Sequence, residues 1–232
     1  MKKQFLLGLT LFLGWAFGTA QDNCSAFYPM IEGASYQYNM FNGKGKLEGS
    51  TSYLVSDVKT NAGNTNAAMN LKFEDAKGKN AFESDYTITC TQDGIKIDFK
   101  SLFPTQMMQQ YENMNVEMDI TGTDVELPNN LSVGQDLADA NVNIKMSMSG
   151  MNMNMAVNTT DRKVIAKESV TTPAGTFDCY VISSNIASKV MMANVQMTDK
   201  LWLSEGVGIV KQESYNKKGK LESTMELVSF SK

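Results

Sequence analysis

The sequence predicts an all-β protein, and three observations favour that class. The first is a turn that occurs three times, at residues 42–46, 75–79 and 216–220, always as Asn or Asp, any residue, then Lys-Gly-Lys. Asn or Asp first and Gly fourth are typical of a type I turn with a left-handed bulge, a common tip of a β-hairpin. The second is apolar/polar alternation on both sides of each turn, and the third is that only one short segment has helical spacing.

Alternation with period two predicts a meander of hairpins in the first half of the chain. Each alternating run indicates a strand with one buried face and one solvated face. The apolar members of these runs are Tyr36, Tyr38 and Met40; Tyr53 and Val55; Met69, Leu71 and Phe73; Phe82, Tyr86, Ile88 and Cys90; and Ile95, Ile97 and Phe99.

The period changes once, after residue 102. Apolar residues then recur at steps of four, one, three and three, which is the spacing of a helical stripe, and Pro104 suits the first helical position. We expect one short helix near residues 104–113, either as part of the core or as a lid over a cavity. The stripe consists of Phe103, Met107, Met108, Tyr111 and Met114.

Strand patterns resume at residue 116 and continue to residue 230. Within them, the apolar positions are even from Val142 to Met148 and odd from Met151 to Val157. A two-residue turn at 149–150 would pair 148 with 151, 146 with 153, 144 with 155 and 142 with 157, and would place all eight side chains on one face. Later strands are expected around residues 164–171, 177–183, 190–200, 207–214 and 225–230.

These patterns predict a single domain over residues 21–232, built as a strongly curved antiparallel sheet or an incomplete β-barrel. A chain of about 212 residues is long enough for one sizeable β-domain.

Residues 1–20 are expected to be a secretory signal peptide. Two lysines precede an apolar stretch from Phe5 to Phe17, and small residues end it. The polar residues 21–23 before Cys24 argue against lipidation of that cysteine. No later run reaches the roughly 18 apolar residues of a spanning helix. We therefore expect an exported protein of the periplasm or cell envelope with no membrane span.

The formal net charge is −4, and it becomes −6 without Lys2 and Lys3. Mild acidity, with no basic stripe and no interleaving of aromatic and basic residues, argues against nucleic acid as a partner. The same balance argues against anionic lipid as the main partner.

Three cysteines in an exported chain permit one disulfide and one spare thiol. Cys24 precedes the first predicted strand and Cys90 ends the fourth, and a four-stranded meander brings those two points to the same end of the sheet. We therefore expect a Cys24–Cys90 bond and a buried, free Cys179. Three reduced, buried thiols are the alternative.

The residues offer little for catalysis. The chain has no histidine, so it lacks the commonest general base and the commonest borderline metal ligand. Gly-rich phosphate loops, nucleophile elbows and zinc spacings are also absent from the sequence. Acidic residues fall mostly at the polar positions of the alternating runs, where a solvated face is the default. We expect no enzyme activity and no cofactor.

Methionine is unusually frequent, with 17 in the chain. These residues could fill an irregular core, line an adaptable apolar pocket, or hold Cu(I) through their thioether groups. One strand alone makes a poor site for three ligands because alternate side chains stand roughly 6.5–7 Å apart, so packing is preferred and no metal is expected. The residues expected to line an apolar-ligand site are Met107, Met108, Tyr111, Met146, Met148, Met151, Met153 and Met155.

Four groups of residues carry a resemblance to a known family. They are Tyr28 and Pro29 with Glu32 and Gly33; Leu127 and Pro128 with Leu131, Val133 and Gly134; residues 172–179; and residues 202–213. Together they resemble an uncharacterised exported family of Gram-negative envelopes, the domain-of-unknown-function 3108-like, TapB-like group. The resemblance covers nearly all of residues 21–232. It implies a barrel-like or curved-sheet fold of the YmcC type and implies no catalytic residues.

Two kinds of non-enzyme then compete. One is a periplasmic binding or carrier module for an apolar ligand such as a lipid moiety. The other is a structural or interaction component of the envelope, with a partner protein and a filled core. A Met-rich Cu(I)-binding protein is a third hypothesis. A cavity of about 300 Å³ or more, lined by apolar side chains, would favour the carrier.

Overall fold

A computed structural model of the chain describes residues 24–97, 117–148, 151–190 and 193–232, and it is all-β over those residues. The predicted helix near residues 104–113 lies outside them. In the described part of the chain, no helix is long and apolar enough to cross a membrane. The strands are β1 Ser35–Asn42, β2 Leu47–Asn61, β3 Asn64–Asp75, β4 Asn80–Thr91, β5 Gly94–Ile97, β6 Glu117–Gly122, β7 Val125–Pro128, β8 Ala140–Met148, β9 Met151–Thr172, β10 Gly175–Val190, β11 Ala193–Ser204, β12 Gly208–Asn216 and β13 Leu221–Ser231.

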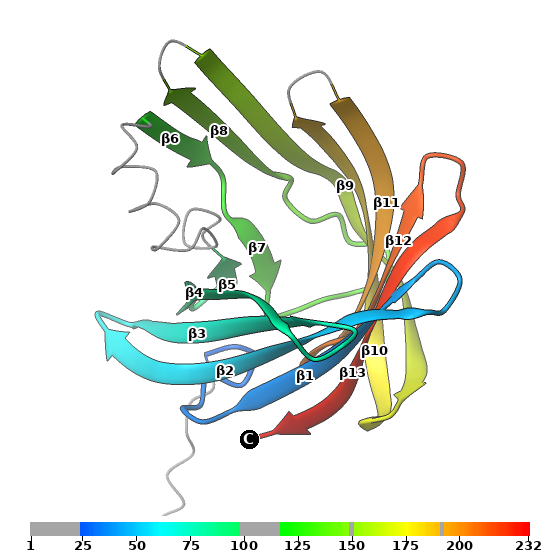
Figure 1. Cartoon of the computed structure of the whole chain (residues 1–232). Coiled ribbons are helices and arrows are strands. Elements are labelled where there is room, and N and C mark those ends of the chain that lie inside the picture. The colour runs from blue at the N-terminus through cyan, green and yellow to red at the C-terminus, as the bar shows by residue number, and fades with distance from the viewer. Residues whose placement is uncertain (1–23, 98–116, 149–150, 191–192) are drawn as a thin grey trace, which may run out of the picture.

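All these strands belong to one sheet, in the order β6-β8-β9-β10-β11-β12-β13-β1-β2-β3-β4-β5-β7. Every paired neighbour is antiparallel. The last strand pairs with the first, from Ser35 opposite Ser231 to Asn42 opposite Ser223. In Figure 1, β1 to β4 form one wall, and β6, β8 and the start of β9 form a second wall that faces it.

The sheet is open, and its two edges come from one short segment of chain. β6 and β7 stand at opposite ends of the strand order, yet only Thr123 and Asp124 separate them in sequence. β6 pairs with β8, whereas β7 pairs with β5. Among the described residues no pairing joins β6 to β7, so the strongly curved sheet is not closed into a barrel.

The three repeated turns have the predicted geometry. The Oδ1 atom of Asn42 accepts the backbone N–H of Lys44 at 3.0 Å and that of Lys46 at 3.1 Å. Asp75 and Asn216 accept the equivalent N–H groups at 2.8–3.1 Å. The glycine at the fourth position has a φ of 74–75° in all three copies, a left-handed conformation that glycine adopts without strain.

The predicted pairing of the β8–β9 hairpin is confirmed. Met148 faces Met151, Met146 faces Met153, Ile144 faces Met155, and Val142 faces Val157. Val142 and Ile144 are buried, but Met153, nearer the tip, is 40% exposed. The shared apolar face therefore leaves the core as the hairpin approaches its turn.

The core lies on the inner, concave face of the sheet. It is built from alternate strand positions, and its most deeply buried members include Val55, Ile88, Val164, Leu203 and Leu227. A smaller apolar cluster of Cys179, Val181, Trp202 and Val210 lies apart from this core. In that cluster the indole N–H of Trp202 donates to the Oε1 atom of Glu168 at 2.6 Å.

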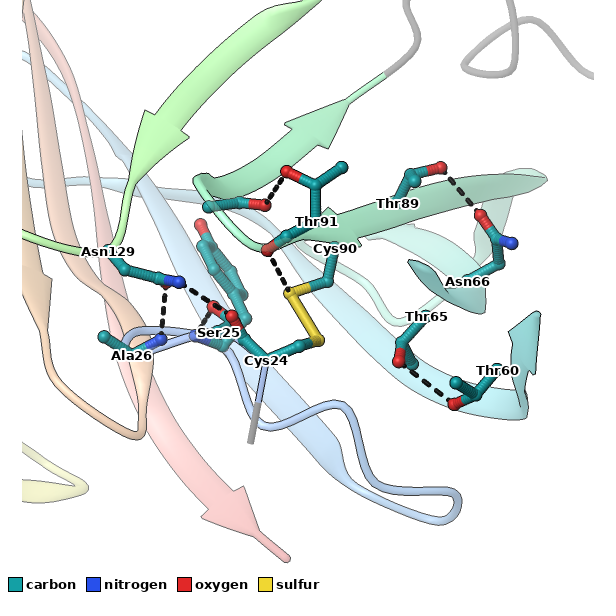
Figure 2. Close-up of a disulfide and its surroundings, with 12 residues drawn as sticks. Cys24, Ser25, Ala26, Thr60, Thr65, Asn66, Thr89, Cys90, Thr91 and Asn129 are labelled. Carbon is teal, nitrogen blue, oxygen red and sulfur yellow. Dashed lines mark hydrogen bonds between the residues drawn. A yellow bond between two sulfur atoms is a disulfide. The ribbon is translucent and has the colours of Figure 1, made fainter. Parts of the chain in front are cut away.

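The expected disulfide is confirmed. Cys24 is bonded to Cys90, with 5.9 Å between their Cα atoms, and Cys179 is free and fully buried. Figure 2 shows Asn129 beside this bond. Its Oδ1 atom accepts the N–H of Ala26 at 2.8 Å, and its Nδ2 atom donates to the carbonyl of Cys24 at 2.8 Å. The bond and the amide together hold the N-terminal segment against the sheet.

A buried arginine fastens edge strand β7. The register of β9 with β10 shifts at Asp161, which has a φ of 52°. The next residue, Arg162, is only 6% exposed. Its guanidinium donates to the carbonyl of Ala138 at 2.6 Å and to that of Glu126, in β7, at 3.1 Å. Burial lowers the pKa of this guanidinium. β7 has a paired strand, β5, on one side only, and the Arg162 side chain holds it in place of a second neighbouring strand.

Breaking the Cys24–Cys90 bond is expected to lower the free energy of unfolding by about 4 kcal/mol, because the bond closes a loop of 66 residues in the unfolded chain. Denaturant unfolding of the Cys24→Ser/Cys90→Ser variant measures this. Cys179→Ala, which leaves the bond intact, is the control. A loss no larger than that of the control would contradict the prediction.

Candidate ligand-binding site

The inner face of the sheet lines an apolar, partly open cavity of about 230 Å³. This is below the roughly 300 Å³ typical of small-molecule pockets. The lining residues are Tyr28, Tyr36, Tyr38, Tyr53, Met69, Leu71, Tyr86, Ile88, Ile97, Val125, Ile209 and Met225.

Strand register gathers the tyrosines of this cavity into one patch. Tyr36 in β1 lies opposite Tyr53 in β2, and Tyr53 lies opposite Leu71 in β3. Met69, two positions before Leu71, lies opposite Tyr86 in β4. Because successive side chains of a strand alternate between faces, these inward positions all meet on the same wall.

Contacts between rings fix the orientation of the tyrosines. Tyr38 and Tyr53 meet edge to face, with centroids 5.7 Å apart, and Tyr53 and Tyr86 meet edge to face at 6.3 Å. Tyr36 stacks on Phe230 at 5.1 Å. Such pairs contribute about 0.5–1.5 kcal/mol each beyond the area that they bury. The aromatic wall is therefore ordered before any ligand arrives.

Tyr28 reaches the cavity from the N-terminal segment. Its ring packs on the backbone of Gly208, where a Cβ atom would lie only 2.8 Å from the ring, and Gly208 has a φ of 96°. Both facts call for glycine at this position. The neighbouring Gly206 donates its N–H to the carbonyl of Ala26 at 2.8 Å. The loop between β11 and β12 thus holds the segment that carries Tyr28.

The tyrosine hydroxyls are the polar groups among the side chains that line the cavity. Tyr38 donates to the carbonyl of Ile209 at 2.9 Å. The hydroxyls of Tyr28, Tyr36, Tyr53 and Tyr86 make no hydrogen bond with any other described residue. Among the described residues, the one buried side-chain oxygen without a partner is Oδ1 of Asp199, so these four hydroxyls are reached by solvent. They are therefore free to exchange hydrogen bonds to water for hydrogen bonds to a polar group of a ligand.

Burial keeps these phenols neutral. Desolvation raises the pKa of all five cavity tyrosines above the ordinary value of 10. For Tyr28, Tyr38 and Tyr86, the neighbouring tyrosines raise the pKa further. No charged side chain belongs to the described lining. The cavity can therefore accommodate an apolar body with a neutral hydrogen-bonding group better than it can a charged one.

Of the eight residues expected to line a ligand site, Met146, Met153 and Met155 have described side chains, and these three do not line this cavity. Met146 and Met155 are half-buried and Met153 is exposed, all on the β8–β9 hairpin. Met107, Met108 and Tyr111 lie outside the described residues, as do the side chains of Met148 and Met151. That these eight bind an apolar ligand stays a prediction.

Sequence reasoning missed the tyrosines, although part of the signal was present. Tyr36, Tyr38, Tyr53 and Tyr86 already occupied apolar positions of alternating runs, and four aromatic hydroxyls on one buried face were a usable clue. Tyr28 had no such signal because it lies outside any strand.

Register also forms a row of methionines that the sequence did not reveal. Met118 in β6 lies opposite Met146 in β8, which lies opposite Met153 in β9. Thioether groups suit Cu(I), and this row supplies the neighbouring strands that such a site would need. The copper hypothesis therefore depends on Met118 as well as on the hairpin.

A second hollow, of about 610 Å³, is larger but chemically different. Most of its side chains are polar and belong to the strand positions that alternate with those of the cavity, among them Gln37, Ser52, Asn70 and Asp85. Tyr36, Tyr53 and Leu71 line both hollows. Asn70 already donates to Asp85. An open, polar hollow gives a ligand little apolar burial, so the smaller tyrosine cavity is the better candidate site.

One buried carboxylate lacks a full set of partners. Asp199 is 7% exposed, and its Oδ2 atom accepts from the Nε2 atom of Gln212 at 2.8 Å. Its Oδ1 atom has no partner among the described residues. Gln212 lies opposite Met225, which lines the cavity, but Asp199 itself does not line it.

Comparisons with known proteins agree with the fold. A model of the DUF3108-like family matches residues 31–227, which confirms the resemblance. A solved structure from Bacteroides fragilis, named as an exported protein with a YmcC-like fold, has a TM-score of 0.71 and 24% identity, and the match covers 90% of this chain and 100% of that one. One from Parabacteroides distasonis, named as a lipoprotein, has a TM-score of 0.69 and 26% identity over 89% and 99%. No curated protein matches the chain.

Removing the Tyr38 hydroxyl is expected to cost about 1–2 kcal/mol, because the carbonyl of Ile209 then loses its donor. Tyr53→Phe is the matched control. It removes the same atom from a neighbouring ring that makes no such bond, so its cost should be clearly smaller. Denaturant unfolding of both variants measures the difference. Equal losses would contradict the assigned hydrogen bonding.

Stability is expected to fall as pH rises above about 10. A phenol whose pKa is raised by folding keeps its proton in the folded state after the unfolded chain has lost it, so its contribution is full below pH 10 and declines above it. Tyrosinate absorbance and circular dichroism, followed together, measure this. The cavity tyrosines should ionise only as the fold is lost. Ionisation of all of them near pH 10 in folded protein would refute the burial assigned to them.

Proposed function

The chain belongs to the DUF3108-like family, and on that premise we propose that it is an exported protein of the cell envelope that binds a small amphipathic ligand, such as a lipid moiety, without changing it chemically. The observation that carries the proposal is the cavity of about 230 Å³ with its four unbonded tyrosine hydroxyls.

The size of the cavity limits the ligand. At roughly 30 Å³ per water molecule, the space equals about eight waters, enough for one ring or a short acyl segment. Burying about six methylene groups would contribute about 5 kcal/mol. Each neutral hydrogen bond to a tyrosine would add about 1 kcal/mol. Together these contributions reach at most about 9 kcal/mol, and association costs of at least about 4 kcal/mol leave about 5 kcal/mol, which corresponds to a dissociation constant of about 0.2 mM.

The chemistry of the lining supports binding over catalysis. Its side chains are tyrosine, methionine, leucine, isoleucine and valine, and none is a ready nucleophile or a general base near neutral pH. The raised pKa of each cavity tyrosine makes a tyrosinate base less available still. Neutral phenols and apolar groups suit a carrier.

Three observations support export to the envelope. Residues 1–20 have the pattern of a signal peptide. A disulfide joins Cys24 to Cys90, and such bonds persist in oxidising compartments. The similar proteins of Bacteroides fragilis and Parabacteroides distasonis are named as exported and as a lipoprotein. Cys24 cannot carry a lipid while its sulfur is bonded to Cys90, which supports our proposal of an unlipidated protein in the periplasm.

The interaction hypothesis assumed a filled interior. A cavity of about 230 Å³ is smaller than the roughly 300 Å³ expected for a carrier, so the interaction hypothesis stays as the alternative. A structural partner protein would bind the outer surface, where the polar hollow of about 610 Å³ lies. Such a partner could coexist with the carrier function.

Filling the cavity should abolish ligand binding. Leu71 lines it, so Leu71→Trp is expected to leave no room for a ligand. The matched control is Leu54→Trp, in the adjacent strand on the other face, where the leucine is 44% exposed. Native mass spectrometry of protein recovered from the envelope should show bound mass on the wild type and the Leu54 variant but not on the Leu71 variant.

Octanol serves as a defined probe for the same site. It should raise the melting temperature of the wild type and the Leu54 variant only, with circular dichroism checking that all three are folded. Two results would count against the carrier: the absence of both bound mass and an octanol shift in the wild type, or equal binding by a folded Leu71 variant.

A further inference from the structure

The three repeated turns all lie at the same end of the sheet. They join β1 to β2, β3 to β4, and β12 to β13, and the sheet order places these hairpins side by side as β12-β13-β1-β2-β3-β4. Because neighbours are antiparallel, alternate connections fall at one end, and the β2–β3 connection falls at the other. The β1–β2 and β12–β13 turns project together in Figure 1.

Close contacts bring the turns together. A Cβ atom on Gly43, in the β1–β2 turn, would lie 2.1 Å from the carbonyl oxygen of Leu221, which directly follows the β12–β13 turn. Gly49, near the tip of the β1–β2 hairpin, lies opposite Asp75, the first residue of the β3–β4 turn. The three tips therefore form one continuous border of the molecule.

This border is rich in lysine, and we call it the lysine end. All seven of its lysines are exposed, and none forms an ion pair with another described residue. They are Lys44, Lys46, Lys77, Lys79, Lys217, Lys218 and Lys220.

Acidic residues at the lysine end are fewer and already occupied. Glu48 and Glu222 accept from the amides of Asn42 and Asn216, and Asp75 accepts backbone N–H groups within its own turn. Glu74 pairs with Lys72 at 2.9 Å. The Glu74–Lys72 pair is neutral, so seven lysines against the other three carboxylates leave a net charge of +4. Without residues 1–20 the chain carries −6, so its remainder carries −10. The protein is therefore strongly polarised along the sheet.

The spacing of the turns allows the lysines to act together. Neighbouring strands are about 4.8 Å apart, so neighbouring hairpin tips are about 10 Å apart, close to the screening length at 0.1 M salt. No single anion site is built here, because Asn42 and its equivalents already accept the N–H groups inside each turn. Positive charges spread over three turns in this way suit a surface that carries many separate negative charges better than they suit a single phosphate group.

We propose that the lysine end docks the protein on an anionic lipid surface. Exposed lysines recognise the phosphate groups of the lipids, and the acidic remainder of the molecule is repelled, so that the turns face the membrane. The turns lack the aromatic side chains that stack on the bases of single-stranded nucleic acid, so a lipid surface fits them better. This docking does not depend on whether the cavity holds a ligand.

The test compares two triple variants of equal charge. The first, Lys44→Gln/Lys77→Gln/Lys218→Gln, removes one lysine from each turn. The second, Lys59→Gln/Lys145→Gln/Lys189→Gln, removes three exposed lysines elsewhere. Protein recovered from an exporting cell is floated with phosphatidylcholine vesicles with or without about 30% phosphatidylglycerol, at about 0.1 M salt.

The wild type and the second variant are expected to bind the anionic vesicles, to lose binding as salt rises, and to ignore pure phosphatidylcholine. The turn variant should bind about 100-fold more weakly, from about fivefold for each of the three lysines. Unfolding midpoints should stay unchanged because all six lysines are exposed. Equal weakening of both variants, or no binding by the wild type, would overturn the proposal. Tighter binding to a single-stranded oligonucleotide than to vesicles would overturn the assignment to lipid.

Discussion

The inner face of the sheet is buried by the curvature of the sheet itself, and the site depends on this constraint. An antiparallel sheet needs only one face covered. Here residues from distant strands, such as Val55, Val164 and Leu203, meet in one core as the walls turn toward each other. Bulges and twist supply the curvature, as at Asp161 in β9 and between Trp202 and Leu203 in β11. The tyrosine cavity lies on this inner face, where β1 to β5, β7, β12, β13 and the N-terminal segment supply its described lining.

The N-terminal segment adds the second element of the site. The disulfide from Cys24 to Cys90 and the amide of Asn129 hold this segment, and Phe27, 1% exposed, anchors it in the core. Tyr28 then reaches the cavity over Gly208. The disulfide therefore stabilises the domain and also sets the shape of the candidate site, because it helps to hold the segment that carries Tyr28.

Local features of this structure were predictable and distant ones were not. The turns, the β8–β9 register and the Cys24–Cys90 bond follow from residues a few positions apart or from the geometry of one meander. The pairing of β13 with β1 and the β6–β8 contact join distant segments, and no local pattern encodes them. The cavity was missed because it depends on the register of four strands. The lysine end was missed because the net charge of the whole chain is a single sum, which does not show where the lysines gather.

A crystal structure of the protein, recovered from the envelope without added ligand, tests the central claim most directly. The proposal predicts continuous electron density for a bound ligand in the cavity, with its apolar part between Leu71 and Val125. At least one polar atom of that ligand should lie at hydrogen-bond distance from the hydroxyl of Tyr36, Tyr53 or Tyr86. A cavity closed by repacked tyrosine and methionine side chains, or one that holds only separate water molecules, would contradict the claim that this family member is a ligand carrier.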